Sequence, residues 1–205
     1  MSASVVQPPA ISVVNCSIDA RKFADVTANF GARLAGTPHE IIGIHDAKSL
    51  AEGYNRGARQ ARGDLLIFSH DDVEILSPDL AGALRRAAAV LDVIGVVGTA
   101  KVLWALWPAA GHPHLRGWIT HPSAGAKPYE VAVFGVDAAV STDLQALDGM
   151  FFAAKRVVWA RVPFDEVTFD GFHGYDIDFT YAAHLAGFHV GTTAEIAVLH
   201  ASSGS

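Results

Sequence analysis

Short runs of apolar residues alternate with stretches of helical periodicity in the first half of the chain. Each run is continuously apolar, and the stretches between them place apolar residues three or four positions apart, as on one face of an amphipathic helix. Continuous apolar strands that alternate with helices are typical of a parallel sheet covered on both faces. The predicted strands are residues 11–16, 40–44, 64–69 and 93–98, and the intervening helices begin near Asp19, Ser49 and Ser77.

This alternation stops after Val102. Residues 103–128 contain four prolines, three histidines and three of the four tryptophans, which predicts a long loop. Strands are predicted again at 129–136 and 150–154, a helix at 176–185, and a strand-like stretch at 189–199. We therefore expect a single α/β domain over residues 1–205, with a Rossmann-type, mostly parallel central sheet flanked by helices.

Composition supports a globular protein and excludes several classes. Of 205 residues, 51% are hydrophobic and 18% charged, which is enough apolar surface for a core. The net charge of −6 argues against a nucleic-acid partner, and the single cysteine, Cys16, excludes an intrachain disulfide. No uncharged apolar stretch approaches about 18 residues, and the N-terminus has no basic leader. We expect no integral membrane segment and a cytoplasmic protein, and leave a homo-oligomer open.

Polar residues follow three of the predicted strands, where ligands bind in open parallel sheets. Two adjacent carboxylates stand among them, and charges held beside an apolar strand need a cation or hydrogen-bond donors. Carboxylate oxygens are suitable ligands for Mg²⁺ or Mn²⁺, so these residues could form a metal site. The alternative is that the two aspartates lie in a solvent-exposed turn and bind nothing. The residues are Asn15 and Ser17, then His45 and Asp46, then His70, Asp71 and Asp72.

Standard phosphate-binding motifs are absent from the sequence. Neither a Walker A motif nor GxGxxG occurs, so a bound nucleoside diphosphate would lack a glycine-rich amide cradle. With only 15 lysines and arginines in the chain, the diphosphate charge would need a metal ion. GxSxG and HExxH are also absent, which leaves the common hydrolase and zincin classes without support.

A second group of carboxylates lies between residues 164 and 178. Asp176 stands at the start of the predicted 176–185 helix, where it would act either as an N-cap or as a general base in a cleft. His200 follows the last predicted strand, and it becomes a candidate ligand if the fold returns it to Asp72.

Two segments resemble family 2 glycosyltransferases, the nucleotide-diphospho-sugar transferases of GT-A fold. They are EGYNRGARQARGDLLIFSHDDVEILSP (52–78) and the stretch over 146–188 that contains ALDGMFFAAKR and FDEVTFDGFHGYDIDFTYAAHLAGF. The closing His200-Ala201-Ser202 is also similar. The resemblance covers residues 11–100 and 146–202, and it divides the chain into a nucleotide-sugar-binding half (1–100), an insert (101–145) and an acceptor-side half (146–205).

The resemblance implies a hexosyltransferase-like enzyme that uses Mn²⁺ or Mg²⁺. It would move a sugar from a nucleotide donor, normally a UDP-sugar, to an unidentified acceptor hydroxyl with inversion. Asp176 would be the base that takes the hydroxyl proton. The implied donor-binding residues are Asn15, His45, Asp46, Asn55 and Asp71, and the implied metal ligands are Asp72, His200 and His70.

Two residues depart from the family pattern. His70 stands at the first position of the usual Asp-x-Asp motif, and Tyr175 replaces the Glu that often precedes the base. They keep a second class open, a non-catalytic nucleotide- or sugar-binding module of the same fold.

Other patterns leave further alternatives open. The spacing of His70 and Asp72 with a distant His200 also fits a non-haem iron oxygenase, although such enzymes are mostly all-β barrels. A second candidate is a zinc site in the 103–128 segment, and the tryptophans there would serve either as a sugar-stacking lid or as apolar anchors. The residues concerned are His112, His114 and His121, and Trp104, Trp107 and Trp118.

Overall fold

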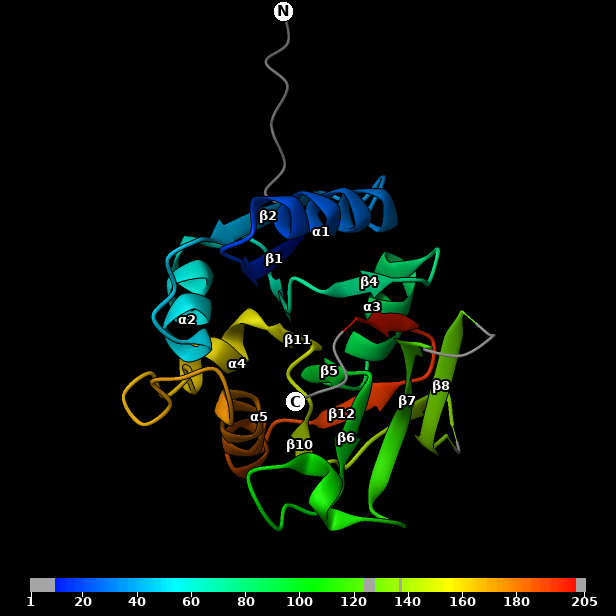
Figure 1. Ribbon diagram of the computed structural model, residues 1–205. Coiled ribbons are helices and arrows are strands. Elements are labelled where there is room, and N and C mark those ends of the chain that lie inside the picture. The colour runs from blue at the N-terminus through cyan, green and yellow to red at the C-terminus, as the bar shows by residue number, and fades with distance from the viewer. Residues whose placement is uncertain (1–9, 124–127, 137, 202–205) are drawn as a thin grey trace, which may run out of the picture.

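The computed structural model describes residues 10–123, 128–136 and 138–201 (Figure 1). Residues 1–9 lie outside this range, and so does Ser202, the last residue of the closing motif. The helices are α1 (Ala20–Arg33), α2 (Leu50–Gln60), α3 (Leu80–Ala88), α4 (Arg156–Arg161), α5 (Tyr175–Leu185) and the short 3₁₀ helix η1 (Trp107–Ala110). The strands are β1 (Ile11–Cys16), β2 (His39–Ile44), β3 (Leu65–Ser69), β4 (Val73–Ile75), β5 (Val93–Gly95), β6 (Val97–Thr99), β7 (Leu115–Pro122), β8 (Tyr129–Gly135), β9 (Val140–Ser141), β10 (Ala146–Leu147), β11 (Phe151–Lys155), β12 (Val190–Thr193) and β13 (Val198–His200).

The larger sheet has the strand order β2-β1-β3-β11-β5-β12-β9. β1 pairs in parallel with β2 and β3, and β12 pairs in parallel with β5. β11 is antiparallel to both β3 and β5, so β3 and β5 run the same way, and β9 is antiparallel to β12. Five of the seven strands therefore share one direction, which confirms the expected mostly parallel sheet.

Both faces of this sheet are buried, as the continuously apolar strands predict. Val13 and Ile67 face a core shared with α1 and α3, whereas Val14 and Phe68 face a core shared with α2, α4 and α5. Neighbouring residues of one strand point to opposite faces, so each strand contributes to both cores. Figure 1 shows α1 and α2 lying against β1 and β2 at one end of this sheet.

A second sheet has the order β10-β6-β7-β13-β4, with β8 added on β7. It corrects the expectation of a loop over 103–128, because Leu115–Pro122 forms β7 and pairs with β6, β13 and β8. The prolines and histidines of this segment favoured a loop in the prediction, but pairing with three neighbouring strands stabilises β7. The predicted strand at 93–98 divides at Val96 into β5 and β6, which belong to different sheets.

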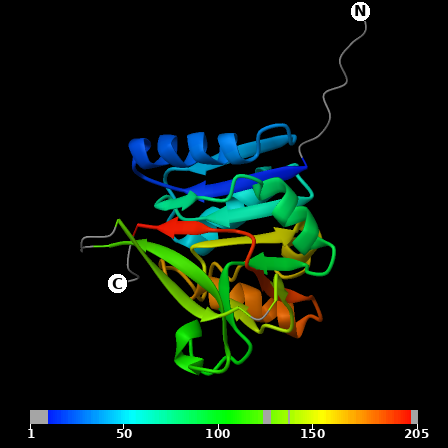
Figure 2. The ribbon, with the colours of Figure 1, turned by 90° about the vertical axis from the view of Figure 1, so that its right-hand side faces the viewer.

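The short strand β4 was not predicted, and it decides where the C-terminal residues go. β4 pairs antiparallel with β13, and the register places His200 opposite Val73. Figure 2 shows β1 and β13 pointing toward the same side of the molecule. The ends of β1, β3 and β13 therefore converge at one edge. Among the described residues, no helix has the length and apolar character needed to cross a bilayer.

Candidate metal and nucleotide site

The edge where β1, β3 and β13 end brings together side chains that are far apart in the sequence. His70, Asp71 and Asp72 follow β3, and His200 ends β13. The backbone N–H of Ala201 donates to the Asp72 carbonyl at 3.0 Å, which extends the β4–β13 ladder to the aspartate. His200 Nε2 then lies 3.3 Å from Asp72 Oδ1. The fold thus returns His200 to Asp72, as a metal site would require.

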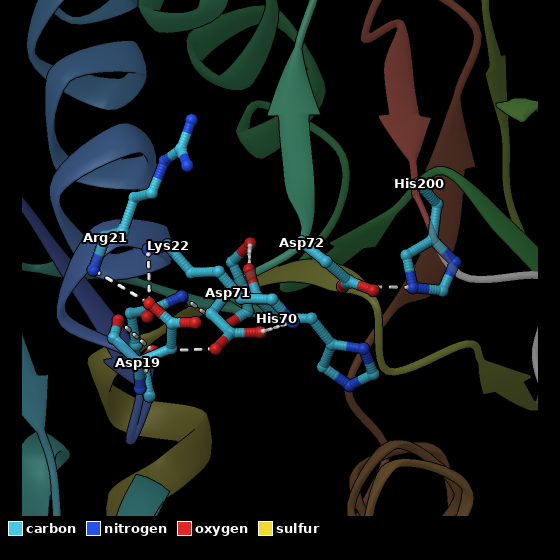
Figure 3. Close-up of polar contacts among 10 residues, drawn as sticks. Asp19, Arg21, Lys22, His70, Asp71, Asp72 and His200 are labelled. Atoms are coloured by element: carbon cyan, nitrogen blue, oxygen red, sulfur yellow. Dashed lines mark hydrogen bonds and ion pairs between the residues drawn. The ribbon is translucent and has the colours of Figure 1, made fainter. Parts of the chain in front are cut away.

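His70 completes a cluster with these two residues. One ligand atom each from His70, Asp72 and His200 lies within 4.8 Å of the other two, and this is the only such group in the described part of the chain. Figure 3 shows the three side chains turned toward one another. Burial lowers the pKa of His70, which favours the neutral imidazole that metal ions bind. Two imidazoles and one carboxylate make a chemically suitable donor set for a divalent transition metal.

Asp71 points away from this cluster and has its own cationic partner. Its carboxylate accepts a hydrogen bond from Ser17 Oγ at 2.7 Å, and Lys22 Nζ lies 3.7 Å away (Figure 3). The two adjacent aspartates therefore diverge, and each has separate partners. Asp71 faces Ser17 and Lys22, whereas Asp72 faces His200.

A cavity of about 340 Å³ opens beside these residues. Its volume lies at the small end of the range of about 300–1,000 Å³ that is typical of ligand pockets. One wall is apolar and the other carries the two aspartates. The lining residues are Cys16, Ser17, Ile18, Ile44, Ala47, Leu50, His70, Asp71, Asp72, Phe172 and His173. Burial raises the pKa of the Cys16 thiol to about 12, so this cysteine is an inert part of the wall.

The structure does not bring His45 and Asp46 into this wall, although they were expected to meet a nucleobase. His45 Nδ1 is 2.8 Å from the Ser17 carbonyl, and its ring packs edge-on against Phe23. Asp46 is an exposed partner of Arg56 at 2.7 Å. The position of a residue at a strand end predicts that it lies near the cavity, but not whether its side chain turns toward the cavity.

Asn15 and Asn55, which are predicted to bind the donor, are both buried and do not line the cavity. Asn15 Nδ2 donates to the Ser69 carbonyl at 2.9 Å, across the β1–β3 pair. Asn55 is only 2% exposed, and its amide joins α2 to the segment after α4. Its contacts are the Phe164 carbonyl, Glu166 Oε2, Trp159 Nε1 and the Phe164 N–H. These hydrogen bonds use both the oxygen and the nitrogen of the amide, and they hold α2 against α4 and the segment that follows it.

Asp176 is not the N-cap of its helix. Gly174 occupies that position with φ 80°, and Asp176 lies in the first turn of α5. Asp176 Oδ2 accepts a hydrogen bond from the Gly149 N–H at 2.7 Å. Burial raises the pKa of Asp176 to about 7, with a further contribution from the charge of Asp148. A carboxyl with this pKa exchanges protons near neutrality, as a general base must.

Asp148 is a functional candidate that the sequence-based prediction missed. Its Oδ2 accepts from Trp107 Nε1 at 2.6 Å, and its Oδ1 accepts from the Met150 N–H at 2.8 Å. The Met150 carbonyl accepts from the His70 N–H at 3.0 Å. The turn at 148–150 thus contacts both His70 and Asp176. The sequence feature that could have indicated this residue is the Asp148-Gly149 pair directly before the apolar strand β11.

Gly149 allows the close approach of α5 to this turn. A Cβ at this position would overlap the Tyr175 hydroxyl and would lie 2.8 Å from Asp176 Cβ. Any side chain here would push the start of α5 away from the 148–150 turn, and the bond between Gly149 and Asp176 would lengthen.

The tryptophans of the insert separate into two kinds. Trp107 is 8% exposed and anchors η1 on Asp148, and Trp118 Nε1 donates to the Ala194 carbonyl at 3.2 Å. These two are anchors rather than a lid, whereas Trp104 is 75% exposed. The three histidines of the insert form no metal-binding group in the described residues.

The mostly parallel sheet flanked by helices, with its cavity at the carboxyl edge, is consistent with the GT-A class of α/β folds. Comparison with known proteins agrees with this class and identifies the family. The chain belongs to the glycosyltransferase-like family, whose sequence profile matches residues 12–202. A search of curated proteins gave no match.

Solved structures show the same fold at low sequence identity. A structure of GalNAc-T7 with UDP, GalNAc and Mn²⁺ is 11% identical, with a TM-score of 0.58, and the match covers 96% of this chain and 44% of that one. The mannosyltransferase PcManGT from Pyrobaculum calidifontis, in complex with GDP-Man and Mn²⁺, is 14% identical, with a TM-score of 0.59 and coverage of 97% and 58%. The protein A197 from STIV is 11% identical, with a TM-score of 0.53 and coverage of 94% and 86%. This chain spans about half the length of the first two. The shared α/β fold removes the basis for the iron-oxygenase alternative.

Proposed function

We propose that this protein transfers a sugar from a nucleoside diphosphate donor to an acceptor hydroxyl, with a divalent ion held by His70, Asp72 and His200. The observation that carries this proposal is the placement of His200 Nε2 3.3 Å from Asp72, beside a cavity at the carboxyl edge of the sheet. Membership of the glycosyltransferase-like family supports it. The bound ion would act as a Lewis acid that stabilises the leaving diphosphate.

The donor set favours Mn²⁺ over Mg²⁺. Mg²⁺ requires nearly all-oxygen octahedral ligation, whereas imidazole nitrogens are acceptable ligands for softer divalent metals. Two of the three ligands here are histidines. The two enzymes described above were solved with Mn²⁺, which agrees with this choice.

A uridine nucleotide is the donor that we expect at the cavity. A pyrimidine needs less space than a purine, and the cavity is small at about 340 Å³. The apolar side chains of Ile44, Ala47 and Leu50 form a wall suited to a base, and Asp71 is placed to accept a hydrogen bond from a ribose hydroxyl. His70 and Asp72 line the same cavity, so the diphosphate would lie toward the metal cluster.

Asp176 is our candidate for the general base. Its pKa of about 7 permits it to accept a proton from an acceptor hydroxyl at neutral pH. The Gly149 N–H donates to Oδ2 of this carboxylate and fixes its position. Direct attack by the activated hydroxyl would invert the anomeric centre.

The first experiment measures binding of Mn²⁺ and UDP by titration calorimetry. The wild-type protein should bind UDP only when Mn²⁺ is present, and Asp72→Ala should abolish that binding because it removes the only carboxylate of the cluster. Glu74→Ala is the matched control, since Glu74 is an exposed carboxylate two residues along the chain. An unchanged isotherm for Asp72→Ala would refute the metal assignment.

Turnover then separates the enzyme from a binding module. We expect UDP release from a panel of UDP-sugars with Mn²⁺ in the presence of acceptors. Mn²⁺-dependent UDP binding without any turnover, over a broad acceptor panel, would instead favour the non-catalytic module.

A further inference from the structure

The two residues that depart from the family pattern are in direct contact. His70 Nε2 lies 2.7 Å from the Tyr175 hydroxyl, although the two residues are 105 positions apart. Each departure taken alone suggests a weakened site. Their contact instead suggests that the tyrosine is the partner which a histidine at position 70 requires.

The hydrogen bonds around Tyr175 connect its hydroxyl to the choice of which ring nitrogen of His70 carries the proton. The Tyr175 hydroxyl donates to the Gly149 carbonyl, at 3.3 Å. The hydroxyl has one proton, which we assign to the Gly149 carbonyl; its oxygen then accepts from His70, and Nε2 carries the N–H. Nδ1 is left with a free lone pair. Figure 3 shows this other ring nitrogen on the side of Asp72 and His200.

Packing fixes the position of the tyrosine hydroxyl. Tyr175 is 3% exposed, and its ring packs against Tyr54 at 5.6 Å and Phe164 at 6.3 Å between ring centroids. Gly149 lies so close to the hydroxyl that a Cβ there would overlap it. The hydrogen-bond partner of His70 is therefore held in one place before any ion arrives.

We infer that Tyr175 is a positioning residue, which orients the His70 imidazole and fixes its tautomer so that Nδ1 faces the ion. This inference rests on the metal site of the proposed function. Histidines that bind metals generally donate their second N–H to an oxygen acceptor, and loss of that acceptor typically weakens metal binding by about 10- to 100-fold. Here a tyrosine on α5 fills that position.

The test measures binding of Mn²⁺ alone, followed by the electron paramagnetic resonance signal of the free ion. Tyr175→Phe should weaken Mn²⁺ binding by about 10- to 100-fold. Tyr181→Phe is the matched control, because it removes the hydroxyl of another tyrosine on α5, whose ring stacks on His184. In a His70→Ala background, Tyr175→Phe should cause no further loss.

The outcomes separate this inference from the proposed function. If the wild-type protein does not bind Mn²⁺, the metal site itself fails. If the wild type binds and Tyr175→Phe binds equally well, or Tyr181→Phe loses as much, only the role of Tyr175 fails. Should Tyr175→Phe not fold, ¹⁵N shifts of His70 in the wild-type protein decide the matter. A proton on Nε2 is expected, and a proton on Nδ1 overturns the inference.

Discussion

Opposing influences act on the carboxyl group of Asp176. Burial disfavours its charged form and the nearby Asp148 adds like-charge repulsion, whereas hydrogen bonds from the backbone N–H groups of Ile177, Asp176 and Gly149 partly offset both. The resulting pKa of about 7 differs strongly from that of a solvated aspartate, and perturbed pKa values of this kind cluster at functional sites. The local chemistry therefore matches the role of a base better than the role of a helix cap.

Replacement of Asp176 by Asn should retain UDP binding but lower transfer by about 10²- to 10⁴-fold, because the amide cannot accept the acceptor proton. In the wild-type protein, kcat should rise with pH as Asp176 deprotonates around pH 7. The measurement is a pH profile of UDP release with acceptor present. Asp178→Asn, two residues along α5, is the control, and a transfer rate for Asp176→Asn equal to the wild type would place the base elsewhere.

The residues of the site were predictable to the extent that they follow a strand. His70, Asp71 and Asp72 come directly after an apolar run, so their location was evident from the sequence. The placement of His200 beside Asp72 depends on the pairing of β4 with β13, which no local pattern specifies. Asp148 was missed because its significance arises from contacts with Trp107 and the Asp176 turn, both distant in sequence.

At the scale of elements, Asn55 connects α2 to α4 and to the segment that follows it. This side chain makes four hydrogen bonds to a segment more than a hundred residues away, and it is nearly inaccessible to solvent. The donors it satisfies, Trp159 Nε1 and the Phe164 N–H, have no replacement if the amide is removed. A buried donor without a partner costs about 1–3 kcal/mol.

Asn55→Ala should therefore lower the free energy of unfolding by about 2–3 kcal/mol, measured by urea denaturation. The affinity for Mn²⁺ and UDP should stay at the wild-type value in the folded variant, because Asn55 does not line the cavity. Arg59→Ala removes an exposed ion pair with Glu166 in the same region and should cost less than about 1 kcal/mol. Lost UDP affinity with unchanged stability would restore the donor-binding role for Asn55.

Elements with a strong local pattern were predictable, and elements stabilised by distant neighbours were not. The helices at Ala20–Arg33 and Leu50–Gln60 follow from apolar spacing and from the caps Asp19 and Ser49. β7 and β4 have no such signal, since the first contains His121 and Pro122 and the second has three residues. Tertiary pairing in the second sheet outweighs local preference there.

At the scale of the whole molecule, the buried Asp176 links stability to pH. Its pKa is raised on folding, so between about pH 4 and 7 the folded state keeps a proton that the unfolded state has lost. The free energy of unfolding should therefore fall as pH rises through this window and become level above it. The neutral, buried His70 acts in the opposite sense, because protonation of the unfolded state at lower pH disfavours folding.

Without added metal, Asp176→Asn should be more stable than the wild-type protein at pH 8, by at most about 4 kcal/mol. The difference should vanish near pH 4, where the carboxyl is protonated in both states. Urea denaturation at several pH values measures it, with Glu74→Gln as the exposed control. A difference that does not change with pH would show that the Asp176 carboxyl is not perturbed by burial.

The antiparallel pairing of β4 with β13 also determines when during synthesis the cluster can exist. His70 and Asp72 leave the ribosome about 130 residues before His200, and until then β4 has no partner on that side. A nascent chain could therefore offer an ion only part of its ligand set. The ability to retain the ion would therefore appear only once β13 has paired with β4, so ion retention would report that this pairing has formed.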